Sequence, residues 1–195
     1  MVMKNIYRDT EHSFAQYVRI LGKGKTSSRS LSFDEARAAM GMILRGEVLD
    51  VQLGAFLMLL RVKEESPEEL AGFVAAARDH MQAPRDITVD LDWSSYAGKR
   101  KHYPWFLFAV KLLVANGVKI FMHGASGHTI NRLYTESILP TLGMAVCHDW
   151  NDVRNAIAST GFSYLSLHHL SPPLGDMIDL RNVMGLRSPV HTLAR

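Results

Sequence analysis

Before residue 85, apolar residues recur every three or four positions, which is the spacing of one buried face of an α-helix. This pattern predicts four helices, the first from His12 to Leu21. The apolar positions of the other three are Ala36, Met40, Ile43 and Leu44, then Leu53, Phe56, Leu57 and Leu60, and then Leu70, Phe73, Val74 and Ala77. We expect these side chains to form the core of a small helical bundle rather than a ligand site.

Three of these helices have polar start signals, and Asp50 is expected to cap the one that contains Leu53 and Phe56. The other two begin with a pair of polar residues. Ser32 is followed three residues later by Glu35, and Ser66 by Glu69, which is the spacing of a capping box. In such a box, each side chain accepts a hydrogen bond from the backbone N–H of the other residue. A short linker around Pro84 follows, so the sequence predicts a helical domain at residues 1–85.

After residue 86 the pattern changes to short apolar runs separated by longer helical stretches. Strands are predicted at 87–91, 118–122 and 162–167, with a further short one at 144–147. Helices are predicted from Pro104 to Asn116, at 129–142, from Asp149 or Asn151 to Gly161, and at 176–184. Pro172 and Pro173 are expected to interrupt the regular structure before the last of these helices. A strand, a helix and a second strand form a βαβ unit with parallel strands.

The predicted fold class is therefore α/β with an N-terminal helical domain, in which residues 86–195 hold a mostly parallel sheet flanked by helices. Three or four strands are few for a covered parallel sheet. We expect the sheet to be incomplete at the C-terminus and the chain to be a fragment of a longer protein.

A basic turn follows the first predicted strand, at the edge where open parallel sheets bind ligands. It contains Lys99, Arg100 and Lys101, and Tyr103 and Trp105 come directly after it. Lysine and arginine suit contact with phosphates, and aromatic rings suit stacking with bases. The alternative is a solvated turn, with Trp105 in the core.

A glycine-containing loop, residues 123–128, follows the second predicted strand at the same edge. Gly124, Ser126 and Gly127 precede a predicted helix, and backbone N–H groups at a helix start bind phosphate or sulfate readily. The alternative is a purely structural turn. The basic loop 22–30 is likewise either a solvated surface loop or a polyanion contact, and it lacks the spacing of a Walker loop.

The composition narrows the function classes. The formal net charge is +3, which permits a polyanionic partner without implying one. No apolar run reaches the roughly 18 residues that span a membrane. Cys147 is the single cysteine, so we expect a buried structural thiol and a cytoplasmic location. The nine histidines form no zinc motif, and we expect no metal site.

The segment 31–81 resembles the N-terminal helical domain of the anthranilate phosphoribosyltransferase and nucleoside phosphorylase group, in the glycosyl transferase family. Among the motifs that match are Leu31-Ser32-x-x-Glu35-Ala36, Gln52-x-x-Ala55-Phe56-Leu57-Met58 and Ser66-Pro67-Glu68-Glu69-Leu70, and later Gly117-Val118-Lys119 with His123-Gly124 and Arg181-x-x-x-Gly185-Leu186-Arg187-Ser188. The resemblance implies a helical domain packed on an α/β domain, and a homodimer formed through the helical domain.

The chain departs from this family at the phosphate loops. A GTGGD loop in the family cradles the pyrophosphate of phosphoribosyl pyrophosphate, whereas the matching window here, residues 94–98, has one glycine and Tyr96 in the space a pyrophosphate needs. The family's Asn-x-Ser-Thr stretch becomes Pro104-Trp105-Phe106-Leu107, and proline has no N–H to give. His123 is kept, and Arg181 matches the arginine that holds the anthranilate carboxylate.

These departures resemble a diverged branch of the family, some members of which are understood to bind nucleic acid. We therefore expect a protein with a degenerate phosphoribosyl pyrophosphate site that binds nucleic acid through Lys99, Arg100, Lys101, Tyr103, Gly124, Ser126 and Gly127. The alternative is an active glycosyl- or phosphoribosyltransferase with an altered substrate, in which His123 and Arg181 orient the acceptor. We expect no cofactor, except Mg²⁺ if the chain is active.

Overall fold

The computed structural model describes residues 11–24, 26–81, 83–96 and 98–194, and the chain divides into two compact units, residues 1–76 and 77–195. The division falls inside helix α4 (Pro67–Met81), whereas the linker in the sequence suggested residue 85. No helix among the described residues is both long enough and apolar enough to cross a membrane.

The helical unit is formed by α1 (Ala15–Gly22), α2 (Phe33–Leu44), α3 (Asp50–Lys63) and the first part of α4, so the four predicted helices are confirmed. The predicted cap of α3 was wrong, because Leu49 is the cap residue and Asp50 lies in the first helical turn. Aromatic rings make the centre of its core. The Phe56 ring lies between Phe14 and Phe73, with centroids 5.2 and 6.2 Å away and edge-to-face geometry. This arrangement is the one that aromatic quadrupoles favour.

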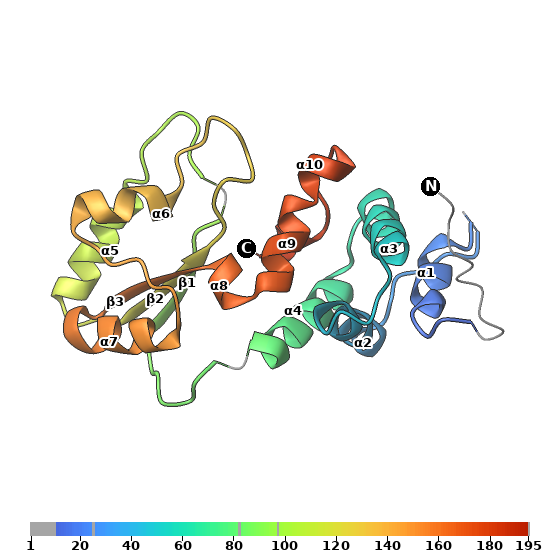
Figure 1. The fold of residues 1–195 in the computed structure, drawn as a ribbon, viewed down its shortest axis with the longest axis horizontal. Helices are drawn as coiled ribbons and strands as arrows, with labels where there is room; N and C mark the ends of the chain where they lie inside the picture. Colours follow the sequence, from blue (N-terminus) through green and yellow to red (C-terminus); the bar gives the residue numbers. More distant parts are fainter. Residues whose placement is uncertain (1–10, 25, 82, 97, 195) are drawn as a thin grey trace. The chain divides into compact units, whose positions relative to one another are not determined.

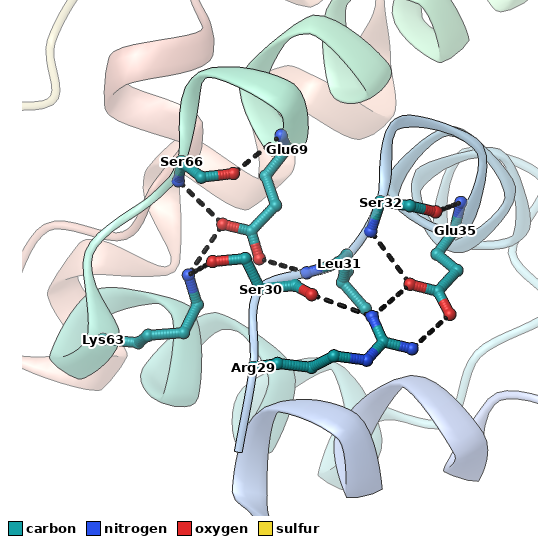
Figure 2. A network of polar contacts seen from close by, with 8 residues as sticks. All are labelled: Arg29, Ser30, Leu31, Ser32, Glu35, Lys63, Ser66 and Glu69. Atoms are coloured by element: carbon teal, nitrogen blue, oxygen red, sulfur yellow. Dashed lines mark hydrogen bonds and ion pairs between the residues drawn. The ribbon is translucent and has the colours of Figure 1, made fainter. Parts of the chain in front are cut away.

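Both predicted capping boxes are present, and they lie side by side (Figure 2). At the start of α2, the Glu35 carboxylate accepts from Ser32 N at 2.9 Å, and Ser32 Oγ accepts from Glu35 N at 3.2 Å. Arg29 adds two charge-assisted hydrogen bonds to Glu35, of 2.6 and 2.7 Å. The Arg29 guanidinium is the main reason why the pKa of Glu35 is lowered from 4.5 to about 2.

The second box is fully buried at Glu69. Its carboxylate accepts from Ser66 N at 2.7 Å, from Leu31 N at 2.9 Å and from Lys63 Nζ at 2.7 Å (Figure 2). A buried carboxylate is tolerated only when it is paired and hydrogen-bonded, and these three donors meet that condition. Glu69 therefore joins the start of α4 to the chain before α2 and to the end of α3.

The α/β unit contains three parallel strands in the order β1 (Leu91–Ser94), β2 (Ile120–Gly124) and β3 (Phe162–Ser166). The helix α5 (Phe106–Ala115) connects β1 to β2, so the predicted βαβ unit is confirmed. The prediction of a first strand at 87–91 was wrong in its position. Just before the strand, Asp90 N donates to Lys119 O at 2.9 Å, and Lys119 N donates to the Asp90 carboxylate at 2.8 Å rather than to a backbone carbonyl.

Helices cover both faces of this sheet (Figure 1). On one face, Leu107 and Val110 of α5 pack with Ile120, Met122 and Tyr164 of the strands, and Leu139 completes the cluster. On the other face, α7 (Trp150–Thr160) places Trp150 against Phe121, with ring centroids 5.6 Å apart. The predicted cap of α7 is confirmed, because Asp149 accepts a hydrogen bond from Asp152 N at 2.8 Å.

The remaining elements are short: α6 (Thr135–Ile138), η1 (Leu139–Leu142), α8 (Leu167–Leu170), α9 (Pro172–Asp179), α10 (Arg181–Met184) and α11 (Val190–Leu193). The predicted helix at 129–142 was wrong in its first six residues. Pro172 and Pro173 begin α9 rather than interrupting the regular structure. Proline is tolerated in the first turn of a helix, because the N–H that it lacks would have no partner within the helix there. The predicted strand at 144–147 is reduced to a single bridge from Cys147 to Leu165.

Candidate functional site

The two loops at the carboxyl edge of the sheet are joined by their backbones. Lys99 N donates to Leu133 O at 2.7 Å, and Leu133 N donates to Lys99 O at 2.8 Å. Arg132 Nη1 reaches the Gly98 carbonyl at 3.4 Å. The basic turn after β1 and the loop after β2 therefore form one continuous surface, as the parallel topology predicted.

An exposed group of basic and aromatic side chains lies on this edge and on the adjoining start of α5. Its members are Lys99, Arg100, Lys101, Tyr103, Trp105 and Phe108, and we call it the basic–aromatic surface. Tyr103 is 66% exposed, Trp105 is 63% exposed and Phe108 is 56% exposed. The alternative that Trp105 belongs to the core is therefore wrong. The Lys99 ammonium lies 5.8 Å from the centroid of the Phe106 ring, within the range of a cation–π contact.

The aromatic rings of this surface follow one another. Tyr103 and Trp105 have ring centroids 5.9 Å apart in an edge-to-face arrangement. Trp105 and Phe108 also lie 5.9 Å apart, with an angle of 21° between the ring planes. The Trp105 and Phe108 rings are therefore nearly parallel while much of their surface stays in contact with water.

The charge of this part of the chain has one sign. The sequence has no aspartate or glutamate between Asp92 and Glu136, and its charged residues there are Lys99, Arg100, Lys101, Lys111, Lys119 and Arg132. Lys99, Arg100 and Lys101 are exposed together at the carboxyl edge of the sheet, and a cluster of cations favours contact with polyanions. The net charge of the whole chain is only +3, because acidic residues elsewhere in the sequence offset these cations.

Tyr96, from the window that matches the family's phosphate loop, is directed into the protein. It is 5% exposed, and its ring stacks on the His128 imidazole with centroids 4.8 Å apart. His128 also lies against Tyr134 and His191, with centroids 5.1 and 5.8 Å away. Burial, and then the nearby His191, Arg187, Arg181 and Arg132, lower the pKa of His128 from 6.5 to about 4, so this imidazole is neutral at pH 7.

Residues Gly124, Ser126 and Gly127 of the loop after β2 each make a contact or adopt a backbone conformation that the fold requires. A side chain at Gly124 would collide with the Ser95 carbonyl, so glycine is required for β1 and β2 to approach there. Gly127 has a positive φ of 78°. Ser126 Oγ donates to the Glu136 carboxylate at 2.5 Å, which places an anion beside the predicted phosphate site. The loop was expected to lead straight into a helix, but α6 begins only at Thr135.

His123 and Arg181 have separate partners. His123 lies on β2, with Nε2 3.2 Å from Asp92 Oδ1, and its hydrogen bond is the main reason why the pKa of Asp92 is lowered. Arg181 Nη1 donates to the His128 carbonyl at 2.7 Å and to Thr129 Oγ1 at 2.6 Å. His123 is thus tied to the neighbouring strand, and Arg181 to the loop after β2.

No three histidine, cysteine, aspartate or glutamate side chains gather into a metal site in the part of the chain that the structure describes. Cys147 is buried, and burial raises the pKa of its thiol, which suits a structural role. Sequence reasoning missed Phe108 as part of the surface. Positions 105, 108 and 112 fall opposite the core positions 107, 110 and 114 on the same helix, but both sets are apolar, so the sequence pattern alone does not say which set is buried.

Comparison with known proteins gives a consistent picture. Residues 15–81 match the helical bundle domain of the glycosyl transferase family. The chain is 29% identical over 185 residues to the uncharacterized protein YbiB of Escherichia coli, which covers 93% of the chain and 58% of YbiB. It is 26% identical over 172 residues to the anthranilate phosphoribosyltransferase of Dictyoglomus thermophilum, covering 88% of the chain and 50% of that enzyme.

The fold is also that of a solved anthranilate phosphoribosyltransferase, from Thermus thermophilus, with a TM-score of 0.70 and 23% identity over 94% of this chain and 54% of that one. The chain spans about half the length of the curated relatives it matches. Residues 15–81 thus match a glycosyl transferase family helical bundle, and the chain as a whole resembles anthranilate phosphoribosyltransferases in sequence and in fold.

Proposed function

We propose that this protein binds nucleic acid through the basic–aromatic surface and that its phosphoribosyl pyrophosphate site is degenerate. The observation that carries the proposal is the charge of residues 93–135, a segment that holds six cationic side chains and no acidic one. Lys99, Arg100 and Lys101 are exposed at the carboxyl edge of the sheet, where ligands of parallel sheets bind. Cations in this position contact phosphates and release counterions.

The aromatic side chains beside these cations support a nucleic acid over other polyanions. Tyr103 and Trp105 are more than half exposed and lie next to each other, and a contiguous group of exposed aromatic side chains is a feature of binding surfaces. Every nucleobase has a flat face that stacks on such rings. Gly124, Ser126 and Gly127 contribute the neighbouring loop, although Ser126 would have to leave Glu136 to reach a phosphate.

Tyr96 supports the degenerate site. The ring is buried against His128 and makes one packed layer between the two loops, where a transferase of this family needs open backbone for a diphosphate. Removing it from that position would expose the unpartnered ring nitrogens of His128. A bound pyrophosphate would therefore have to displace a packed aromatic pair.

Two further parts of the proposal concern assembly and location. By its similarity to the transferases, the protein forms a homodimer through the helical unit, which sedimentation velocity tests. The single buried thiol of Cys147 is consistent with the reducing cytoplasm.

The direct test is a binding titration with fluorescently labelled nucleic acid at low and at moderate salt. The proposal expects binding that weakens steeply with salt, because phosphate contacts release counterions. Affinity that does not change with salt, or no binding at low salt, would contradict it.

A further inference from the structure

Helix α5 has two apolar faces. Leu107 and Val110 on the first face are buried in the core of the α/β unit. Trp105, Phe108 and Leu112 on the second recur at the spacing of a single helix face, and Leu112 is 66% exposed. An exposed row of large apolar side chains on a folded domain marks a binding surface.

This apolar row is continuous with the basic turn. Tyr103 joins the turn to Trp105, with ring centroids 5.9 Å apart, and Phe108 continues the series at the same spacing. A partner that matches this surface presents flat apolar groups beside negative charges. An unpaired nucleic-acid strand does so, because its bases are free to stack and its backbone carries a phosphate at every nucleotide.

A double helix fits the same surface poorly. Its bases are stacked on one another inside the duplex, so a protein meets phosphates, sugars and the base edges in the grooves. The cations of the basic turn would be used by a duplex, but the faces of Trp105 and Phe108 would remain in water. The aromatic row therefore distinguishes the two forms of nucleic acid, while the basic turn does not.

We propose, resting on the proposed function, that the nucleic acid bound is single-stranded and that its unpaired bases stack on Trp105 and Phe108 while its phosphates contact Lys99, Arg100 and Lys101. The Trp105 and Phe108 rings are nearly parallel and more than half exposed, which suits stacking with successive bases. Leu112 extends the apolar surface along the helix, and Tyr103 lies at the end of this surface that adjoins the basic turn.

The experiment compares fluorescence anisotropy of a labelled oligothymidylate strand and of a labelled duplex of equal length, with the full chain and its variants. Trp105→Ala and Phe108→Ala should each weaken binding of the single strand by about fivefold to a hundredfold and change duplex binding by less than about twofold. Phe108→Leu keeps apolar area but removes the ring, so it should behave like Phe108→Ala. Thermal unfolding of each variant checks that the fold is retained.

Two controls distinguish the contribution of base stacking from that of phosphate contact. Phe33→Ala removes a partly exposed aromatic ring from α2 in the helical unit and should leave both affinities unchanged. The triple change K99Q/R100Q/K101Q should weaken both forms of nucleic acid. If it does so while the aromatic variants bind the single strand as the unchanged protein does, the proposed function stands and the inference is overturned.

Other outcomes also decide the matter. Equal or tighter binding of the duplex, with no effect of Phe108→Ala, would overturn the single-strand preference. Loss of self-association in Trp105→Ala or Phe108→Ala, seen by sedimentation velocity with nucleic-acid binding unchanged, would assign the aromatic row to a second copy of the chain. No binding of either nucleic acid at low salt would overturn the proposed function and this inference together.

Discussion

The Tyr96 ring stacks on the His128 imidazole, with ring centroids 4.8 Å apart and 19° between the planes. The pair joins the segment after β1 to the loop after β2. Tyr96 is thus part of the interior of the α/β unit, in the segment that matches the diphosphate-binding loop of the similar transferases. Under the proposed function, this packing would leave no room for a diphosphate.

Replacing Tyr96 with alanine should lower the free energy of unfolding by about 3 kcal/mol, because a buried aromatic ring is lost and a cavity remains. Tyr96→Phe keeps the ring and should cost much less. Denaturant unfolding followed by circular dichroism measures both. Equal stability of the alanine variant and the unchanged protein would show that the ring does not support the fold.

His128 should make stability depend on pH. Its pKa in the folded protein is about 4, below the unfolded value of 6.5, so the unfolded chain takes up a proton first as the pH falls. The stability contribution of the neutral imidazole is complete above pH 6.5 and is lost as the pH falls toward 4. His128→Phe keeps a ring but does not titrate, and its melting temperature should fall less between pH 7 and pH 4.

The direct observation for this prediction is the nuclear magnetic resonance titration of the His128 ring. A midpoint near 6.5 would mean that the ring is hydrated and free to accept a proton. The melting curves of both proteins will also contain a shared contribution from carboxylates such as Glu35, whose pKa of about 2 places its own transition at lower pH.

Glu69→Ala should be among the most damaging changes in the helical unit. It removes the carboxylate that accepts from Leu31, Ser66 and Lys63, and it leaves a half-buried ammonium without its anion. We expect a loss of about 3–5 kcal/mol. Glu35→Ala removes the equivalent residue of the more exposed box and should cost about 1 kcal/mol. Similar losses for the two variants in urea unfolding would contradict the distinction between buried and exposed boxes.

Local sequence signals predicted the helical unit well. The two capping boxes depend on residues three positions apart, so Ser32, Glu35, Ser66 and Glu69 identified the starts of α2 and α4 without knowledge of the tertiary structure. The sequence did not reveal that Glu69 also accepts from Leu31, because that contact joins residues far apart in the chain.

The elements of the α/β unit that the sequence predicted wrongly depend on contacts between residues far apart in the chain. Residues 129–134 were expected to be helical, but Leu133 uses its N–H and its carbonyl to pair with Lys99, and Asn131 has a positive φ of 61°. The exposure of Trp105 could not be read from its type, since α5 is apolar on nearly every side and the pattern leaves its buried face ambiguous.

The alternative of an active transferase leads to a direct assay. The protein mixed with phosphoribosyl pyrophosphate, anthranilate and Mg²⁺ should release no pyrophosphate above background if, as we propose, the diphosphate site is degenerate. Tyr96 is buried, and Arg181 is engaged by His128 and Thr129. Turnover that disappears in Arg181→Ala would support the alternative and overturn the degenerate site. Turnover that persists in that variant would point to a contaminating enzyme.

The central claim is that Lys99, Arg100 and Lys101 contact phosphates. The most direct measurement is the slope of log binding constant against log salt concentration for a labelled single strand, compared between the unchanged protein and K99Q/R100Q/K101Q, with Arg61→Gln of α3 as a control. We predict that the triple variant has a slope shallower by about 2, since each lost phosphate contact removes about 0.7, and that Arg61→Gln has the slope of the unchanged protein. A slope near zero in the unchanged protein, or the same slope in the triple variant, would contradict the account.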